Sequence, residues 1–494
     1  MAMDGAEPST DRLLEASAAV SSDELDTARF GFHQHFPKRS AKRVFFATQT
    51  IALLALISGL IWAMLEAPAL TLTALHVAAF ALFAIVIGFR LIAAAHLQPV
   101  LSRLAEPATW PTYTILCPLY REANVAPDLI AAIKAIDYPK AALDVKLLVE
   151  ADDPDTIAAA LAVAGAAHIE VIILPPAAPR TKPKALNVGL SRARGAFITV
   201  FDAEDRPHPQ QLRAALAAFE DGEETLACVQ APLVVDNQDA SWLSRQFAAE
   251  YAVQFRELLP LLAKLKLPLP LGGSSNHFRT DALRASGGWD AFNVTEDADL
   301  GYRLARDGYH SGVIAPPTWE EAPVTYNAWL DQRTRWIKGH MQTWLVLMRN
   351  PLRTAREMGL AAFVAMHVML TGGLVAAFAH GPLAIALIIA AVSPHDLLTP
   401  ADFALALFGY CVSIFAALTA CALSNSLSHA RAALTMPAYW PLSSLAAYRA
   451  LFALIFRPHR WSKTEHGVSL RRRYSVPAPP KRHVSAPTLL ARGA

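Results

Sequence analysis

Four groups of residues that could carry chemistry occur in a fixed order along the chain: Asp152-Asp153, Asp202-Ala203-Glu204, Thr295-Glu296-Asp297 and Gln332-Arg333-Thr334-Arg335-Trp336. Carboxylates hold divalent cations and accept protons, and arginine binds anions. The ordered set therefore indicates an enzyme that holds a metal diphosphate and deprotonates an acceptor. The Gln/Arg/Trp group enters an apolar run, which indicates that it works against a membrane.

Asp202 and Glu204 follow a β-rich run, Phe197–Val200. Two acidic side chains at i and i+2 past a strand end can share one Mg²⁺ or Mn²⁺, and such a cation would neutralise a diphosphate leaving group. The alternative is a solvated acidic turn in which Asp205 caps the next helix.

A nucleotide could be held by residues that follow two other predicted strands. Asp152 and Asp153 could accept hydrogen bonds from a nucleobase or ribose, or Asp153 could simply cap the following helix. Tyr120 could lie near the base and Glu122 could bind ribose.

Lys182 and Lys184 precede a helix and could contact phosphates as point charges; we assign Lys184 to the nucleotide site. A solvated basic loop is the alternative.

The third group opens a helix. Thr295 is a good N-cap, and Glu296 and Asp297 then lie in the first turn, where the helix dipole favours anions. A carboxylate kept ionised there is available as a general base. Plain helix capping is the alternative.

Residues 328–350 form an amphipathic pattern in which Gln332, Arg335, Trp336 and Gly339 share one face. Arg335 would contact the diphosphate and Trp336 would stack on an acceptor sugar. Because Trp also prefers the bilayer interface, a helix that only skims the membrane is the alternative.

Strand and helix patterns alternate through residues 107–327. The pattern predicts strands and helices at Tyr113–Leu119, Val125–Ile136, Val145–Glu150, Pro154–Ala164, Ile169–Leu174, Lys184–Arg192 and Ala196–Phe201. Such βαβ units form a mostly parallel, Rossmann-like α/β sheet, and ligands bind at the carboxyl edge of such sheets. The acidic residues are therefore expected to converge.

Composition indicates a membrane protein with a soluble part, because 54% of residues are hydrophobic and only 17% are charged. Lys+Arg minus Asp+Glu is 44 − 42 = +2, which argues against nucleic-acid binding. None of the four cysteines forms a CxxC pair, so neither a zinc site nor a disulfide framework is indicated.

Residues 44–97 predict a transmembrane hairpin with spans Val44–Leu65 and Leu70–His96. Basic residues flank both outer ends, so both ends should face the cytoplasm. Residues 1–43 are expected to be a flexible cytoplasmic N-terminus.

Residues 359–456 predict about four further spans. Gly359–Val392 is divided into two by a turn at Gly372-Gly373 or at His380-Gly381-Pro382, and Ala401–Leu423 and Ala432–Phe456 follow. An even number returns residues 457–494, a basic tail, to the cytoplasm.

The ordered motifs resemble those of membrane-embedded family 2 glycosyltransferases, the group that includes cellulose synthase and hyaluronan synthase. The resemblance covers residues 110–345 and implies a GT-A fold, inverting transfer from a nucleotide sugar, usually a UDP-sugar, and Mg²⁺ or Mn²⁺. The last position of the second motif departs from the family, because Glu204 replaces an aspartate. Residues 272–277 resemble the segment beneath the acceptor.

Roles carried over by position follow from this resemblance. Asp297, with Glu296 beside it, would be the base, and Asp202 and Glu204 would hold the metal diphosphate. The nucleotide would lie on Tyr120, Glu122, Asp152, Asp153 and Lys184, and the diphosphate and acceptor on Gln332, Arg333, Arg335 and Trp336.

The expected function is processive synthesis of a polysaccharide. The protein is expected to be a multi-pass protein of the inner (plasma) membrane with its catalytic domain in the cytoplasm. Accessory export subunits are candidate partners. Single-sugar transfer to a lipid is the alternative within enzymes. A non-catalytic scaffold or transport subunit is the alternative outside them.

Overall fold

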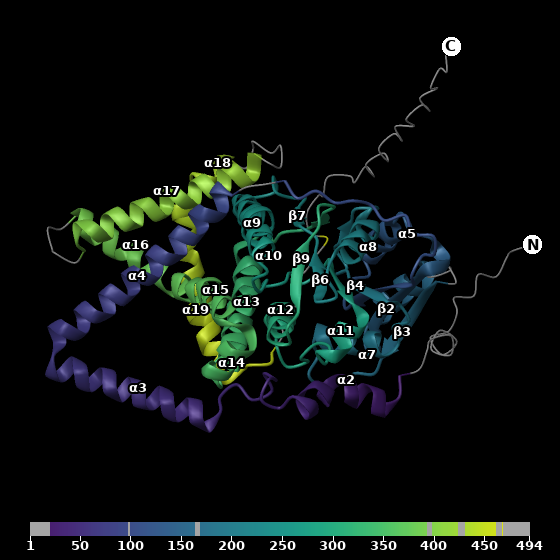
Figure 1. The fold of residues 1–494 in the computed structure, drawn as a ribbon, viewed down its shortest axis with the longest axis horizontal. Coiled ribbons are helices and arrows are strands. Elements are labelled where there is room, and N and C mark those ends of the chain that lie inside the picture. The colour runs from purple at the N-terminus through teal and green to yellow at the C-terminus, as the bar shows by residue number, and fades with distance from the viewer. Residues whose placement is uncertain are drawn as a thin grey trace, which may run out of the picture.

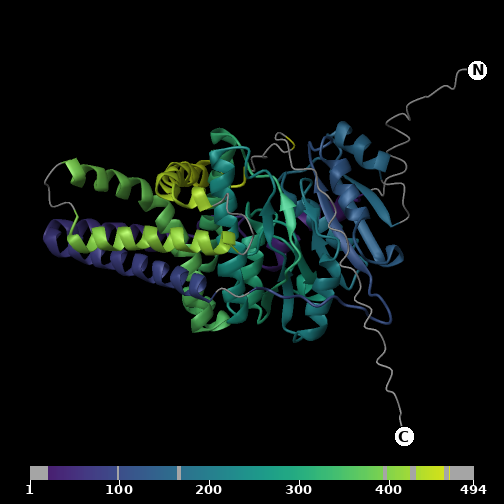
Figure 2. The ribbon, with the colours of Figure 1, turned by 90° about the horizontal axis from the view of Figure 1, so that it is seen from above.

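The computed structural model describes residues 20–96, 99–163, 168–392, 398–422, 430–460 and 467. An α/β domain forms one part, and long helices extend from one side of it (Figures 1 and 2). This arrangement confirms the expected architecture of an α/β domain inserted between apolar helices.

The central sheet has seven strands in the order β3-β2-β1-β4-β8-β6-β9. Its pairings are parallel except those of β8, which runs antiparallel to β4 and β6. The strands are β1 Tyr113–Leu119, β2 Leu143–Glu150, β3 Ile169–Leu174, β4 Phe197–Val200, β6 Leu226–Gln230, β8 Asn276–Arg279 and β9 His310–Val313. The mostly parallel sheet expected from the sequence is confirmed. A small second sheet contains β5 Arg206–Pro207, β10 Thr318–Glu320 and β7 Leu233–Val235.

The strand order reverses between β1 and β4. From β1 the chain steps outward to β2 and β3, and then returns to place β4 on the other side of β1. In open α/β sheets a ligand binds outside the carboxyl ends of the strands at such a point. The loops after β1 and β4 carry Glu122 and Asp202, so topology alone brings these two side chains to one place.

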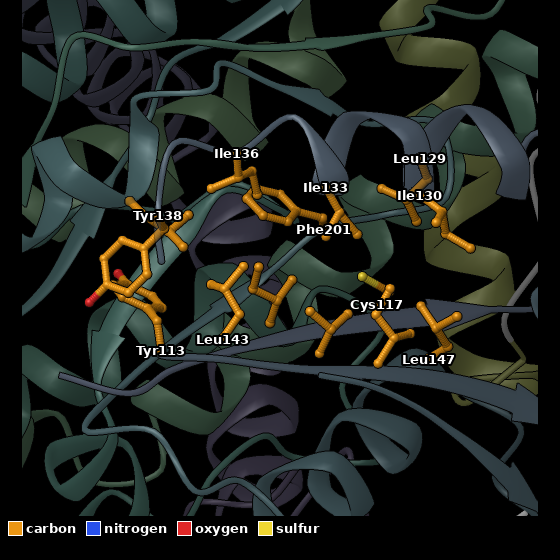
Figure 3. Close-up of a cluster of buried hydrophobic side chains, with 14 of the residues drawn as sticks. Tyr113, Cys117, Leu129, Ile130, Ile133, Ile136, Tyr138, Leu143, Leu147 and Phe201 are labelled. Carbon is orange, nitrogen blue, oxygen red and sulfur yellow. The ribbon is translucent and has the colours of Figure 1, made fainter. Parts of the chain in front are cut away.

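Apolar side chains of β1, β2 and α5 form the core beneath this edge (Figure 3). Ile130 and Ile133 of α5 lie over Cys117 of β1 and Leu147 of β2, and all four side chains are at most 1% exposed. Full burial of one such aliphatic side chain is worth about 1.5–3 kcal/mol. The sheet edge that carries the polar residues is therefore supported by a layer of closely packed apolar side chains.

Helices of the α/β domain cover both faces of the sheet and lead to the long apolar helices (Figures 1 and 2). They are α5 Ala126–Lys134, η1 Lys140–Ala142, α6 Pro154–Val163, α7 Lys182–Ser191, α8 Gln211–Asp221, α9 Trp242–Val253, η2 Gln254–Leu258, α10 Leu259–Lys264, α11 Thr280–Ala285, α12 Glu296–Arg306, α13 Tyr326–Leu347 and α14 Pro351–Met358.

Within the described residues, four helices are long and apolar enough to cross a membrane: Ala47–Glu66 (α3), Pro68–Ala95 (α4), Leu360–Val392 (α15, η3 and α16) and Pro400–Ala422 (α17). All four extend from the same side of the α/β domain (Figures 1 and 2). The first two correspond to the predicted hairpin.

The predicted division of Gly359–Val392 into two spans is wrong. Leu360–Met366 (α15), His367–Thr371 (η3) and Gly372–Val392 (α16) form one continuous helix. Pro382 has no N–H for the carbonyl of Phe378, which would normally end the helix. Tyr448 Oη of a neighbouring helix donates to that carbonyl at 3.4 Å, and Ser444 Oγ, whose shorter bond is to the carbonyl of Ala377 at 2.6 Å, lies 3.3 Å from it. The neighbouring helix therefore supplies donors to the carbonyls that precede the proline.

The prediction that Ala432–Phe456 is a membrane span is also wrong. The chain forms a short helix, α18 Ala430–Ala433, and then α19 Met436–Phe456, which is not among the four apolar helices. Helix α19 runs across the base of the long helices and packs on α13 (Figure 1). Its polar contacts fix it there, since Tyr439 Oη accepts from Trp329 Nε1 at 2.8 Å and Arg449 pairs with Asp331 at 2.6 Å.

The predicted flexible N-terminus is contradicted for the part that the structure describes. Ser22–His35 forms helix α2, which lies on α7 and buries Leu25, Ala28 and Phe32. Asn187 Nδ2 of α7 donates to the carbonyl of Ala28 at 2.9 Å. The segment is mostly polar, but Leu25, Ala28 and Phe32 lie at i, i+3 and i+7 on one face of the helix. This narrow apolar stripe is sufficient to dock the helix. Residues 1–19, and residues 461–466 and 468–494 of the tail, lie outside the described residues.

Candidate functional site

A cavity of about 1850 Å³ opens at the carboxyl edge of the sheet, between β1 and β4, and continues toward the long helices. Ten of the thirteen predicted site residues line it: Tyr120, Glu122, Asp202, Glu204, Glu296, Asp297, Gln332, Arg333, Arg335 and Trp336. The other three, Asp152, Asp153 and Lys184, do not line it. Three of the four motifs, at residues 202–204, 295–297 and 332–336, therefore converge on this cavity, and the Asp152-Asp153 pair does not line it.

Gly273, in the loop before β8, lines the cavity beside the acidic groups. A methyl group placed on Gly273 would lie 3.4 Å from Asp297 Oδ2 and 3.8 Å from both Asp202 Oδ2 and Lys182 Nζ. The Nζ atom of Lys182 also lies 2.5 Å from Asp202 Oδ1 and donates to the carbonyl of Gly273 at 2.5 Å. The backbone of Gly273 therefore lies directly against two carboxylates and one ammonium group.

Asp297 lies in the first turn of α12 with one oxygen held and the other directed at the cavity. The N–H of Ala298 donates to Asp297 Oδ1 at 2.8 Å, and Oδ2 is the atom that approaches Gly273. Burial raises the pKa of Asp297, although the Ala298 N–H and the charge of Lys182 oppose the shift. A buried carboxylate in this arrangement is a stronger base than one in water.

Glu296 has a more strongly shifted pKa. Burial and then the neighbouring charge of Asp297 raise its pKa to about 7, against an ordinary value of 4.5, and Lys182 opposes the shift. The cluster thus contains more negative charge than Lys182 neutralises.

Stability should therefore fall with rising pH when no divalent cation is present. A carboxyl group with a raised pKa in the folded state stabilises the fold below about pH 4.5, and this contribution is lost as the pH rises through 7. Replacing Glu296 with glutamine removes the titration, so we expect the variant to lose less stability than the natural protein between pH 5 and pH 8, by on the order of 2–3 kcal/mol. Melting temperatures at both pH values test this, and equal losses in the two proteins would contradict it.

Lys184, which the sequence assigns to the nucleotide site, does not line the cavity. It is the third residue of α7 and is fully buried, and its Nζ atom pairs with Glu150 Oε1 at 2.7 Å. Lys182, the first residue of α7, points into the cavity instead. Lys182 and Lys184 both lie in the first turn of α7. Side chains two positions apart in a helix face different directions, so only one of the two lysines faces the cavity.

Asp152 and Asp153 hold the structure around the cavity without lining it. Asp153 accepts from the N–H of Thr156 at 3.3 Å, as a helix cap does, and from the N–H of Arg121 on the neighbouring loop. Asp152 accepts from Arg180 Nη1 at 2.5 Å. Both oxygens of Asp153 are thus engaged with the backbone.

Tyr120 and Glu122 line the cavity at the end of β1. Glu122 is 8% exposed, and its Oε2 accepts from the N–H of Tyr120 at 3.1 Å. This turn brings Arg121 to a φ of 55°, in the left-handed region. The loop is therefore shaped so that an aromatic ring and a carboxylate face the same space.

Helix α13 passes close to the first turn of α12. A methyl group placed on Gly339 would lie 2.3 Å from Thr295 Oγ1 and 2.5 Å from Thr295 Cγ2, so only glycine permits this contact. The approach brings Arg335 to the acidic cluster, where burial lowers its pKa and Glu296 and Asp202 oppose the shift. Gln332, on the same face, is buried, and no hydrogen-bond partner for its Oε1 occurs in the described part of the chain.

Arg333 and Trp336 form the cavity wall toward the membrane helices. The Trp336 ring stacks on Tyr251 of α9, with centroids 6.3 Å apart and planes at 19°. Arg333 bonds to Glu250 of α9 and donates to Tyr439 Oη of α19 at 3.1 Å. Arg333 lines the cavity, and its polar contacts also join α13 to α9 and α19.

Among the described residues no group of three or more His, Cys, Asp or Glu side chains is arranged to hold a metal ion, so a divalent cation here would be held by the pair Asp202 and Glu204 together with phosphate oxygens. Both carboxylates line the cavity, and with Glu296 and Asp297 they make four acidic groups beside Lys182 and Arg335. Mg²⁺ and Mn²⁺ are held by one or two carboxylates together with phosphate oxygens, and such an ion would relieve the excess negative charge that raises the pKa of Glu296.

Sequence reasoning missed three of the residues that face this space. Glu150 lines the cavity and has one buried oxygen, Oε2, with no hydrogen-bond partner in the described residues. Tyr251 stacks on Trp336 in the cavity wall. Lys182 faces the cavity, although the sequence assigns Lys184 to the nucleotide site. The only local signal was the position of Glu150 at the last residue of a buried strand.

Known proteins were compared with this chain. It is 26% identical over 252 residues to "Probable glycosyltransferase YdaM" of Bacillus subtilis, which covers 50% of this chain and 59% of the relative. It is 26% identical over 284 residues to "Beta-monoglucosyldiacylglycerol synthase" of Synechocystis, with coverage of 55% and 57%. The chain thus spans little more than half of the length of these curated relatives.

Among solved structures, a mannosyltransferase from Pyrobaculum calidifontis in complex with GDP-Man and Mn²⁺ shares 18% identity, with a TM-score of 0.49, over 76% of this chain and 98% of that one. The family described as "Glycosyl transferase family group 2" matches residues 197–451, which is more than half of the 494 residues. The chain is a member of glycosyl transferase family group 2.

Proposed function

We propose that this protein is an inverting glycosyltransferase that transfers a sugar from a nucleotide sugar, a UDP-sugar on the resemblance of its motifs, to an acceptor that enters from the membrane side. The observation that carries the proposal is the meeting of Asp297, Asp202 and Lys182 around the bare backbone of Gly273. A base, a pair of carboxylates suited to a cation, and a cation for phosphate are the groups that this reaction requires.

The acceptor hydroxyl lies against Asp297 Oδ2, which takes its proton. The hydroxyl oxygen forms a bond to the anomeric carbon while the bond from that carbon to the diphosphate oxygen breaks. The nucleoside diphosphate leaves with the electron pair, and attack from the opposite face inverts the configuration.

Lys182 and Arg335 place positive charge where the leaving diphosphate gains negative charge. Both are partly buried, so their charges act in surroundings less polar than water, where they are worth more than in water. Asp202 and Glu204 would hold Mg²⁺ or Mn²⁺, which when bound supplies further positive charge to the diphosphate.

Two classes of acceptor are candidates. The Gln-Arg-x-Arg-Trp motif, resembling that of cellulose synthase and hyaluronan synthase, favours a growing polysaccharide. The relatives named beta-monoglucosyldiacylglycerol synthase favour a lipid. In either class the stacked rings of Trp336 and Tyr251, which line the cavity together with Asp297, would contact the acceptor.

We also propose that the protein is embedded in the inner (plasma) membrane with the α/β domain in the cytoplasm. The basic residues Lys38, Arg39, Lys42 and Arg43 precede α3, and Arg103 follows α4. The end of α19 returns to the same side, because Lys338 Nζ donates to the carbonyl of Arg460 at 2.7 Å. Four spans therefore leave all basic flanks on one side, as the positive-inside rule requires.

Nucleotide release tests the proposal. The detergent-purified protein should release nucleoside diphosphate from one member of a panel of UDP- and GDP-sugars, in the presence of Mg²⁺ or Mn²⁺ and membrane lipids, and chelation of the metal should stop it. Absence of release from every donor under these conditions would contradict the proposal.

A further inference from the structure

The cavity does not end at the acidic cluster. It continues along one face each of α4, α16 and α17 as far as His76 and Asp402, whose Nε2 and Oδ1 atoms lie 2.8 Å apart. On α4 the lining residues run from Arg90 to His76, which at 1.5 Å per residue is about 21 Å. The hydrocarbon core of a bilayer is about 30 Å thick, so the cavity traverses most of it.

The lining has polar ends and an apolar middle. The middle section, here called the tail groove, is lined from α4, α16 and α17 by Ala79, Phe80, Phe83, Leu383, Ala386 and Ala406. None of these side chains can donate or accept a hydrogen bond. A glycan chain drawn through the groove would lose water from its hydroxyls without gaining partners, which is costly. An alkyl or isoprenoid chain makes no hydrogen bonds to water, so it loses none when it enters the groove.

A group of polar and aromatic side chains, here called the polar ring, lines the cavity next to the tail groove: Arg90, Ser413, His380, Tyr410 and Trp440. Arg90 Nη1 donates to Ser413 Oγ at 3.0 Å, and the Arg90 guanidinium lies 5.8 Å from the ring of Trp440. The carboxylates of Glu250 and Glu257 act on Arg90 from the α/β domain, so the ring carries both signs of charge. A charged side chain in a membrane helix is expensive and usually marks a functional site. Donors and acceptors together suit a hydroxylated headgroup.

The order along the cavity is therefore a base, an aromatic wall, a polar ring and an apolar groove. We infer that the acceptor is a membrane lipid, whose hydroxyl reaches Asp297, whose headgroup lies at the ring of Arg90 and Ser413, and whose hydrocarbon chain lies in the tail groove. The inference rests on the proposed function and assigns its acceptor class. The lipid hydroxyl gives its proton to Asp297, its oxygen bonds to the anomeric carbon, and the nucleoside diphosphate departs.

Two neighbouring residues of α17 provide a matched test. Ala406 lines the tail groove, whereas Leu407 points away and is 66% exposed. Three proteins are compared: the natural protein, Ala406→Trp and Leu407→Trp. Each is reconstituted into vesicles made from the total polar lipids of the cell in which it was expressed, with dioleoylglycerol added. Each is supplied with a labelled nucleotide sugar, and label is measured in the chloroform-soluble and water-soluble products.

For the natural protein and Leu407→Trp we expect label in the chloroform-soluble product, and for Ala406→Trp a loss of tenfold or more. Ala79→Trp, which fills the groove from α4, should give the same loss. A melting temperature that still rises on addition of the nucleotide shows that the variants are folded.

Three outcomes overturn the inference: label in a water-soluble polymer, transfer by Ala406→Trp and Ala79→Trp at the natural rate, or nucleotide release from the natural protein with no label in lipid. Failure of the natural protein to release any nucleotide instead contradicts the proposed function, so the two failures are distinguishable.

Discussion

Replacement of Asp297 with asparagine is expected to lower the rate of sugar transfer by about 10²–10⁴-fold, because a general base contributes this much. The amide keeps the shape of the side chain and its contact with the Ala298 N–H, but it cannot take the acceptor proton. Binding of the nucleotide should remain, since the nucleotide contacts other residues. Initial rates and the nucleotide-induced rise in melting temperature measure the two properties separately.

The matched control is Asp281→Asn. Asp281 also lies in the first turn of a helix, α11, but is exposed and does not line the cavity. Its replacement should leave the rate unchanged. Nearly normal turnover by Asp297→Asn would exclude Asp297 as the base and direct attention to Glu296, the other carboxylate of the same turn.

Replacement of Gly339 with alanine should separate α13 from the motif at Thr295. The added methyl group would lie 2.3 Å from Thr295 Oγ1, far inside contact distance, so one of the two helices has to move. Overpacking of this kind costs about 1–3 kcal/mol of stability. A displacement of about 1 Å in a catalytic site can cost 10²-fold in rate, so we expect a loss of about 10–100-fold.

Gly59→Ala is the control for Gly339→Ala. Gly59 lies in α3, and a methyl group placed there meets no atom within 4 Å. The double variant Gly339→Ala, Thr295→Ala removes the two nearest atoms, Oγ1 and Cγ2, and should recover part of the lost melting temperature. A single Gly339→Ala variant with the natural rate and melting temperature would show that the close approach is not required.

Much of the α/β domain was predictable because its signals are local. Strands Tyr113–Leu119 and Ile169–Leu174 were predicted with the bounds that the structure gives, since runs of buried β-branched and aliphatic residues between turns form strands in a parallel sheet. Convergence of Glu122, Asp202 and Glu204 followed from topology, because parallel strands end at one edge, whereas Asp152 and Asp153 do not line the cavity. Helix α2 was missed because three apolar residues in a polar segment are a weak signal until a partner surface is present.

The membrane region was less predictable. Glycine and proline in Gly359–Val392 indicated a turn, but whether proline ends a helix depends on whether another group satisfies the carbonyl that it leaves unpaired. Here Ser444 and Tyr448, more than sixty positions away, donate to the carbonyls that precede the proline. No local pattern contains that information.

The sequence by itself determined the strand–helix alternation, the apolar helices and the identity of the chemical groups at the sheet edge, because these follow from local periodicity and strand ends. Tertiary structure decided which of two lysines faces the cavity, that Gly339 brings α13 to Thr295, and that the cavity continues between α4, α16 and α17. The physical reason is that side-chain direction and helix approach depend on contacts between residues far apart in the chain.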